Sequence, residues 1–159
     1  MGSPYWSDEH DAYANKLLFA ADALLLGRST YEGFSGSWPT RSGDPYADRI
    51  NAMPKYVAST TLTDPTWNAT VLQGDVVAEI TKLKQQDGQN ILKFGTGPLD
   101  RVLVENKLVD EFHFWIFPVF SGSGEHLFEN VGIDLTHLEL VDSTSFSTGI
   151  VVATYAPKA

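Results

Sequence analysis

Cysteine is absent from this 159-residue sequence. The absence excludes disulfide bonds, thiolate catalysis, and zinc or iron–sulfur sites that depend on cysteine ligands. Long apolar runs are also absent: no stretch reaches the roughly 18 residues that a membrane-spanning helix needs, and no signal peptide is visible. We therefore expect a cytoplasmic protein with no membrane partner.

Basic residues are in short supply. Eleven Lys and Arg stand against twenty Asp and Glu, which gives a formal net charge of −9. Nucleic acids and anionic membranes reward an excess of basic residues, so neither is expected to be the main partner. A small phosphorylated molecule stays possible, because a few amides and one or two cations can hold a phosphate locally.

Several catalytic signatures are missing as well. The four histidines are dispersed and show no H-x-x-x-H or H-E-x-x-H spacing, so we expect no metal site. No G-x-S-x-G element is present, which disfavours a serine hydrolase, and no G-x-x-x-x-G-K-[ST] element is present, which excludes a P-loop nucleotidase.

What is present is the composition of a folded globular protein. Hydrophobic residues make up 43% of the chain and charged residues 19%. This balance and the length predict one domain spanning residues 1–159 with a sizeable core.

Hydrophobic periodicity predicts alternating helices and strands. We expect helices at 8–21, 29–34, 46–53, 75–87 and 98–107, and strands at 21–27, 55–59, 69–73, 90–94 and 110–120. Residues 135–156 predict two further strands joined near Ser147, Thr148 and Gly149 as a hairpin. The alternation favours an α/β fold: a three-layer α/β/α domain whose mostly parallel central sheet carries a C-terminal antiparallel hairpin.

Polar residues follow three of the predicted parallel strands. Because ligands of open α/β sheets bind beyond the carboxyl ends of the strands, each of these segments is a candidate anion site. The three segments are Arg28, Ser29 and Thr30; Ser59, Thr60 and Thr61; and Gly95, Thr96 and Gly97.

The Gly95-Thr96-Gly97 turn is the sharpest of the three, and it has two readings. Glycines let a backbone approach a pyrophosphate closely, and Pro98 suits the first turn of the following helix. The same residues also make an ordinary tight turn. A standard dinucleotide fingerprint fails, because Asp100 stands where its third glycine would fall.

Two charged segments also have two readings each. Arg28 is a candidate to bind a phosphate such as the 2′-phosphate of NADP, or a surface arginine paired with a nearby carboxylate. The acidic residues Asp8, Glu9 and Asp11 include a possible proton donor, although they also suit a solvated, well-capped helix start.

Taken in order, these segments resemble a known superfamily. "ADALLLGRSTYEGF", "KYVAST" and "ILKFGTGPLDRVLVENKLVDEFHFWIFPVFSGSGEHLFE" resemble dihydrofolate-reductase-like proteins. They are most similar to the reductase domain of the bacterial bifunctional riboflavin-biosynthesis enzyme, that is, the RibD C-terminal domain family and its stand-alone relatives. The likeness extends from about residue 12 to residue 155.

This resemblance implies an NADPH-dependent reductase and assigns roles to residues. Arg28 and Thr30 would lie near the cofactor phosphates, and Ser59, Thr60 and Thr61 would hold the adenosine 2′-phosphate side. The pyrophosphate would lie on Gly95, Thr96, Gly97 and Leu99. The expected reaction is hydride transfer to a C=N bond of a pterin-like or ribosylaminopyrimidine-like molecule, with Asp11 as the candidate proton donor.

One feature departs from the family. Its members begin with a strand and a Ser-x-Asp-Gly-like loop beside the nicotinamide, whereas no candidate for that strand precedes the first predicted helix here. We therefore expect a family domain without its first strand. Two other hypotheses are a nucleotide-binding protein without catalysis and a structural domain, in which "FHFWIF" (residues 112–117) would form a homodimer interface.

Overall fold

The computed structural model describes residues 5–124, 126–128 and 131–158. The chain divides into two compact units, which are described separately: unit 1 comprises residues 1–14 and 100–159, and unit 2 comprises residues 15–99. The expectation of a single domain stays a prediction.

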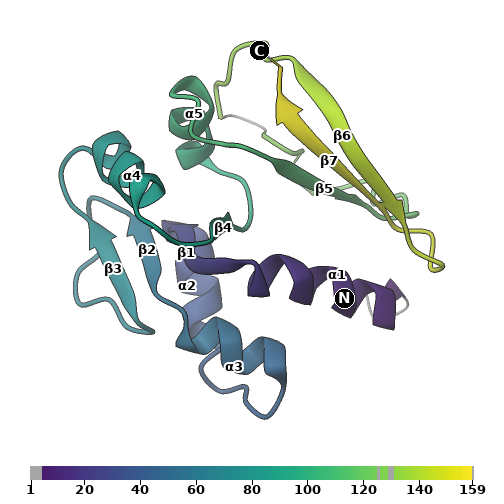
Figure 1. The fold of residues 1–159 in the computed structure, drawn as a ribbon, viewed down its shortest axis with the longest axis horizontal. Helices are drawn as coiled ribbons and strands as arrows, with labels where there is room; N and C mark the ends of the chain where they lie inside the picture. The colour runs from purple at the N-terminus through teal and green to yellow at the C-terminus, as the bar shows by residue number, and fades with distance from the viewer. Residues whose placement is uncertain (1–4, 125, 129–130, 159) are drawn as a thin grey trace. The chain divides into compact units, whose positions relative to one another are not determined.

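Unit 2 contains a parallel four-stranded sheet in the order β3-β2-β1-β4 (Figure 1). Its strands are β1 (Ala21–Gly27), β2 (Lys55–Ala58), β3 (Ala69–Leu72) and β4 (Asn90–Lys93). β1 lies between β2 and β4, and four of its residues in a row, 23–26, are buried. Continuous burial is typical of a parallel strand covered on both faces.

The helices begin where local chemistry favours it. They are α1 (Asp8–Phe19), α2 (Arg28–Ser37), α3 (Pro45–Ala52), α4 (Val76–Gln85) and α5 (Pro98–Glu105). Asp44 and Asp75 are the N-caps of α3 and α4, and each side chain accepts a backbone N–H three residues on. Pro45 and Pro98 are each the first residue of a helix, where a missing N–H costs nothing.

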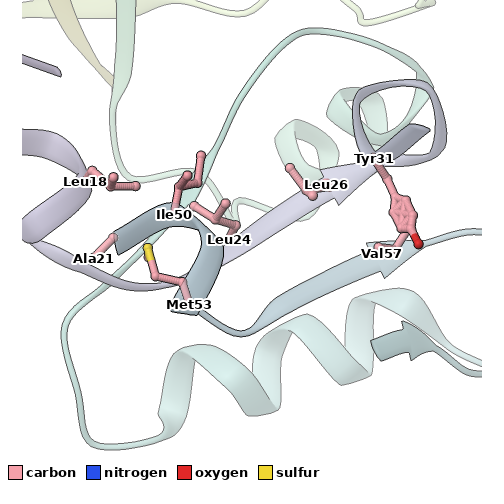
Figure 2. Packing of buried hydrophobic residues seen from close by; sticks show 8 residues of the cluster. All are labelled: Leu18, Ala21, Leu24, Leu26, Tyr31, Ile50, Met53 and Val57. Atoms are coloured by element: carbon pink, nitrogen blue, oxygen red, sulfur yellow. The ribbon is translucent and has the colours of Figure 1, made fainter. Parts of the chain in front are cut away.

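The core of unit 2 joins α1, α2, α3 and the two central strands. Figure 2 shows its buried side chains, which come from α1, β1, α2, α3, the residue after α3, and β2. The cluster consists of Leu18, Ala21, Leu24, Leu26, Tyr31, Ile50, Met53 and Val57. This packing fixes the start of α2 beside the ends of β1 and β2.

Unit 1 contains an antiparallel three-stranded sheet in the order β5-β7-β6. Its strands are β5 (Phe112–Ile116), β6 (Leu138–Ser145) and β7 (Val151–Pro157). The predicted turn at residues 147–149 joins β6 to β7, with the N–H of Phe146 donating to the carbonyl of Ile150 at 2.8 Å. Phe146, Ile150 and Val152 form a second core, against which Tyr5, Tyr13 and Trp115 pack.

The α/β fold class with a parallel sheet and a C-terminal antiparallel hairpin is confirmed. One detail differs: the hairpin pairs with β5 in a separate sheet and does not extend the parallel sheet. The reason is that β5 and β7 share an aromatic and aliphatic core of their own. β5 is also shorter than the predicted strand 110–120, because its pairing with β7 ends at Ile116. Pro118, two residues later, has no N–H to donate to a neighbouring strand.

The segment expected to form a dimer interface lies at the free edge of this sheet. β5 pairs only with β7 among the described strands, and Ile116 at its end and Phe120 beyond it are exposed. A homodimer through this segment stays a prediction. Within the described residues, no helix is long and apolar enough to cross a membrane.

Candidate functional site

The sheet order brings the three predicted anion-binding segments together at one edge. β2, β1 and β4 are neighbours and run parallel, so the residues that follow them lie at the same end of the sheet. Because the chain order reverses at β1, with β2 on one side and β4 on the other, this edge is a topological switch point. Open α/β sheets bind ligands at such points.

α2 begins directly after β1 and leaves its first amides open. Gly27 is the N-cap in an extended conformation, and it contributes no side-chain hydrogen bond. The first N–H groups of a helix have no partner within the helix. The α2 start therefore offers backbone donors to an anion beside the Arg28 side chain.

Arg28 is held by three side chains. Its Nε–H donates to Oε1 of Glu32 at 2.6 Å, and its Nη1 donates to Oγ1 of Thr61 at 2.9 Å and to Oγ of Ser59 at 3.3 Å. A guanidinium carries five N–H donors, so these contacts leave the two on Nη2 for a ligand. Arg28 thus pairs with a carboxylate, as one interpretation of the sequence expected, and it also donates to two hydroxyls. Phosphate binding by Arg28 stays a prediction.

The two hydroxyls are left as donors. Oγ of Ser59 accepts from Arg28 and also from the backbone N–H groups of Thr61 and Leu62, at 3.2 and 3.0 Å. These bonds occupy its lone pairs, so its hydrogen is available to an acceptor. Oγ1 of Thr61 likewise accepts from Arg28. The cluster of Arg28, Ser59 and Thr61, here called the anion cluster, combines a guanidinium with two hydroxyls that can donate, which are the groups that bind a phosphate.

The loop that follows Thr61 in the chain is held by Tyr31. This buried side chain belongs to the first turn of α2, and its hydroxyl accepts the N–H of Thr66 at 2.8 Å. Thr60, another predicted site residue, lies between Ser59 and Thr61 in sequence and is exposed. Tyr31 therefore links the α2 start to the segment after β2.

The Gly95 turn contacts the same region through Thr30. Gly95 has a φ of +75°, and a Cβ on it would lie 2.9 Å from Oγ1 of Thr30. Both the conformation and the contact require glycine at this position. A Cβ on Gly97 would meet nothing within 4 Å, so the space beside its α-carbon could take an additional atom.

The remaining predicted residues are placed as follows. Thr96 is exposed, and Leu99 is half-buried in the first turn of α5. Asp11 lies in the first turn of α1, half-buried, within unit 1. Its role as a proton donor stays a prediction.

The sequence pattern did not indicate a role for two charged residues at this edge, Glu32 and Lys93. Glu32 pairs with Arg28 because α2 begins at Arg28, which places the two residues one turn apart. The sequence predicted a helix only from residue 29, so the i, i+4 spacing went unused. Lys93 ends β4, and its Nζ donates to the carbonyl of Gly95 at 3.0 Å. Its nearness to the turn was visible in the sequence, but the direction of its side chain was not.

The comparisons with known proteins agree with this fold. The sequence profile of the RibD C-terminal domain matches residues 2–152. This chain belongs to the RibD C-terminal domain family. The predicted resemblance is thereby confirmed, and the reductase-like character of the family supports a possible oxidoreductase.

The chain has curated relatives in Bacillus subtilis. It is 30% identical to the uncharacterized protein YyaP over 139 residues, which cover 84% of this chain and 73% of YyaP. It is 28% identical to the uncharacterized protein YwjB over 157 residues, covering 94% of this chain and 84% of YwjB.

Solved structures share the fold. A proposed riboflavin biosynthesis protein from Shewanella sp. PV-4 aligns with a TM-score of 0.67 at 23% identity, over 91% of this chain and 78% of that one. A pyrimidine reductase-like protein from Corynebacterium diphtheriae gives 0.60 at 13% identity, over 100% and 85%. A diaminohydroxyphosphoribosylaminopyrimidine deaminase/5-amino-6-(5-phosphoribosylamino)uracil reductase from Thermotoga maritima gives 0.60 at 14% identity, over 96% of this chain and 50% of that one.

Proposed function

We propose that this protein is an NADPH-dependent reductase that acts on a C=N bond of a pterin-like or ribosylaminopyrimidine-like molecule. The observation that carries the proposal is the anion cluster at the switch-point edge of a RibD C-terminal domain. A guanidinium and two hydroxyls that can donate suit a phosphate monoester, and the 2′-phosphate is the group that distinguishes NADPH from NADH.

The residues present fit the cofactor. The anion cluster would bind the 2′-phosphate, with Thr60 beside it. The Gly95–Gly97 turn, Thr30 and Leu99 would lie along the pyrophosphate, where the space beside Gly97 leaves room for it. When bound, NADPH supplies a hydride. Anchoring the phosphates at two places restricts the cofactor to one orientation, which lowers the entropic cost of reaction.

Reduction of a C=N bond also needs a proton at nitrogen. We propose Asp11 as the residue that donates it, because it is a half-buried carboxyl group in the first turn of α1. Asp11→Asn should abolish turnover while leaving NADPH affinity within about twofold, since a proton donor contributes to chemistry more than to binding. A large loss of NADPH affinity in this variant would contradict the assignment.

The experiment that tests the function has two stages. First, the protein is titrated with NADPH and NADH while the fluorescence of its four tryptophans is followed. Second, NADPH absorbance is followed with dihydrofolate and with 5-amino-6-(5-phosphoribosylamino)uracil. Preferential NADPH binding with turnover supports the proposal. Binding without turnover of either compound favours the non-catalytic nucleotide-binding alternative, and absence of binding overturns both.

A further inference from the structure

Glu32 places a negative charge beside the positive charge of the anion cluster. Its carboxylate accepts from Nε of Arg28 at 2.6 Å, and no other carboxylate pairs with Arg28 among the described residues. The two side chains are partly exposed, at 39% for Arg28 and 58% for Glu32. An arriving phosphate therefore meets one positive and one negative charge, not a lone guanidinium.

We propose that Glu32 is a specificity-determining residue that lowers the affinity of the anion cluster for a phosphate dianion. The inference rests on the proposed function, because it concerns the same 2′-phosphate site. Two effects of Glu32 must be separated. Its acceptor oxygen fixes the guanidinium through Nε, whereas its negative charge repels the phosphate across the few ångströms of the guanidinium.

The geometry of the arginine explains the first effect. With Nε held by Glu32, Nη1 reaches both Ser59 and Thr61, and Nη2 is left for the ligand. A free arginine side chain would lose rotamer entropy on binding, so an anchored one binds at a smaller cost. This anchoring needs only an acceptor oxygen, which glutamine also provides.

The charge explains the second effect. Replacing Glu32 by glutamine keeps the acceptor and removes one negative charge beside the site. We expect Glu32→Gln to bind NADPH about three- to tenfold more tightly at low ionic strength, because repulsion between exposed charges a few ångströms apart is of that order. NADH affinity should not change, since NADH carries no 2′-phosphate. Glu32→Ala loses the anchor as well, so its NADPH affinity should fall below that of Glu32→Gln.

The test measures the affinities of NADPH, NADH and adenosine 2′-monophosphate for the wild type, Glu32→Gln and Glu32→Ala. Glu105→Gln is the matched control, because Glu105 forms the same i, i+4 pair with a different arginine, Arg101, at 2.9 Å. Tighter binding of NADPH and adenosine 2′-monophosphate by Glu32→Gln alone supports the inference. Unchanged or weaker binding by Glu32→Gln, with a wild type that prefers NADPH, overturns the inference and leaves the proposed function standing. A wild type that does not distinguish NADPH from NADH overturns both.

Discussion

At the residue scale, Gly95 shows how one position links the fold to the site. Its φ of +75° belongs to the left-handed region, which side chains disfavour, and the Thr30 hydroxyl lies only 2.9 Å from where its Cβ would be. The sequence could predict that Gly95 made a turn. It could not predict the contact with Thr30, because that contact depends on β1 and β4 being neighbours.

The two glycines of the turn should therefore respond differently to alanine. Gly95→Ala should lower the free energy of unfolding by about 1 to 2 kcal/mol, from backbone strain and the displaced Thr30 side chain. Gly97→Ala should leave stability nearly unchanged, because its Cβ enters open space. Urea unfolding followed by circular dichroism measures both. Equal losses in the two variants would contradict this account.

A bulky residue at Gly97 tests the ligand instead of the fold. Gly97→Leu should weaken NADPH binding more than tenfold while the protein stays folded, since its side chain would occupy the space assigned to the pyrophosphate. Unchanged NADPH affinity would remove this turn from the site.

The burial of Lys55 could not be predicted from the sequence. A lysine at the start of a strand is normally exposed, yet Lys55 is fully buried, with Nζ 4.0 Å from the Trp67 ring centroid and donating to the carbonyl of Asn51 at 3.0 Å. Burial lowers the pKa of Lys55 from 10.5 to about 8. This environment depends on the position of the Trp67 ring, and Trp67 has a φ of +62° that its sequence neighbours do not predict.

The lowered pKa has a consequence for stability against pH. Between about pH 8 and pH 10.5 the unfolded chain still holds a proton that folded Lys55 has released, so stability should rise with pH across that window. Lys55→Met should lack about 2 kcal/mol of this rise. Urea unfolding near pH 7 and near pH 10 measures the difference, with the exposed Lys82→Met as control. Parallel pH profiles for wild type and Lys55→Met would refute the prediction.

At the element scale, most helices and strands could be predicted because their local signals agree. Periodicity, the Asp44 and Asp75 caps, and the two prolines at helix starts all point to the observed boundaries. The start of α2 was missed by one residue, which hid the pairing of Arg28 with Glu32. The sheet to which the hairpin belongs could not be predicted, because strand pairing is decided by long-range packing.

The start of α1 is tied to the hairpin turn by a single carboxylate. Glu9 accepts from the Ser147 backbone N–H at 2.8 Å and from the Ser147 hydroxyl. The hydroxyl and then the backbone bond lower the pKa of Glu9 from its ordinary value of 4.5. The contribution of this contact is present above that ordinary value and is lost as the pH falls through the lower folded value.

Glu9→Gln should consequently melt at a lower temperature than the wild type at neutral pH, and the difference should shrink in acid. Thermal unfolding at a series of pH values tests this expectation. Glu139→Gln, an exposed position on β6, is the control and should leave the melting temperature unchanged. A constant difference between wild type and Glu9→Gln across the acid range would show that the charge of Glu9 is not involved.

At the scale of the whole molecule, the three polar segments were visible in the sequence, but their assembly was not. Each follows a strand that local pattern predicts, and the sheet order β3-β2-β1-β4 places those strands side by side. The absence of a standard dinucleotide fingerprint at Asp100 is consistent with a site that spreads its anion contacts over three strand ends. If the anion cluster binds the 2′-phosphate, the protein should prefer NADPH, and this preference should depend on Arg28.

The most direct measurement compares the dissociation constants of NADPH and NADH for the wild type, Arg28→Met and Arg101→Met. The wild type should prefer NADPH, and Arg28→Met should lose about ten- to a hundredfold in NADPH affinity with little change for NADH, as expected for a charge-assisted phosphate contact. Arg101→Met removes an arginine from the equivalent i, i+4 pair on α5 and should keep the preference. An Arg28→Met variant that still prefers NADPH as strongly as the wild type would contradict the account.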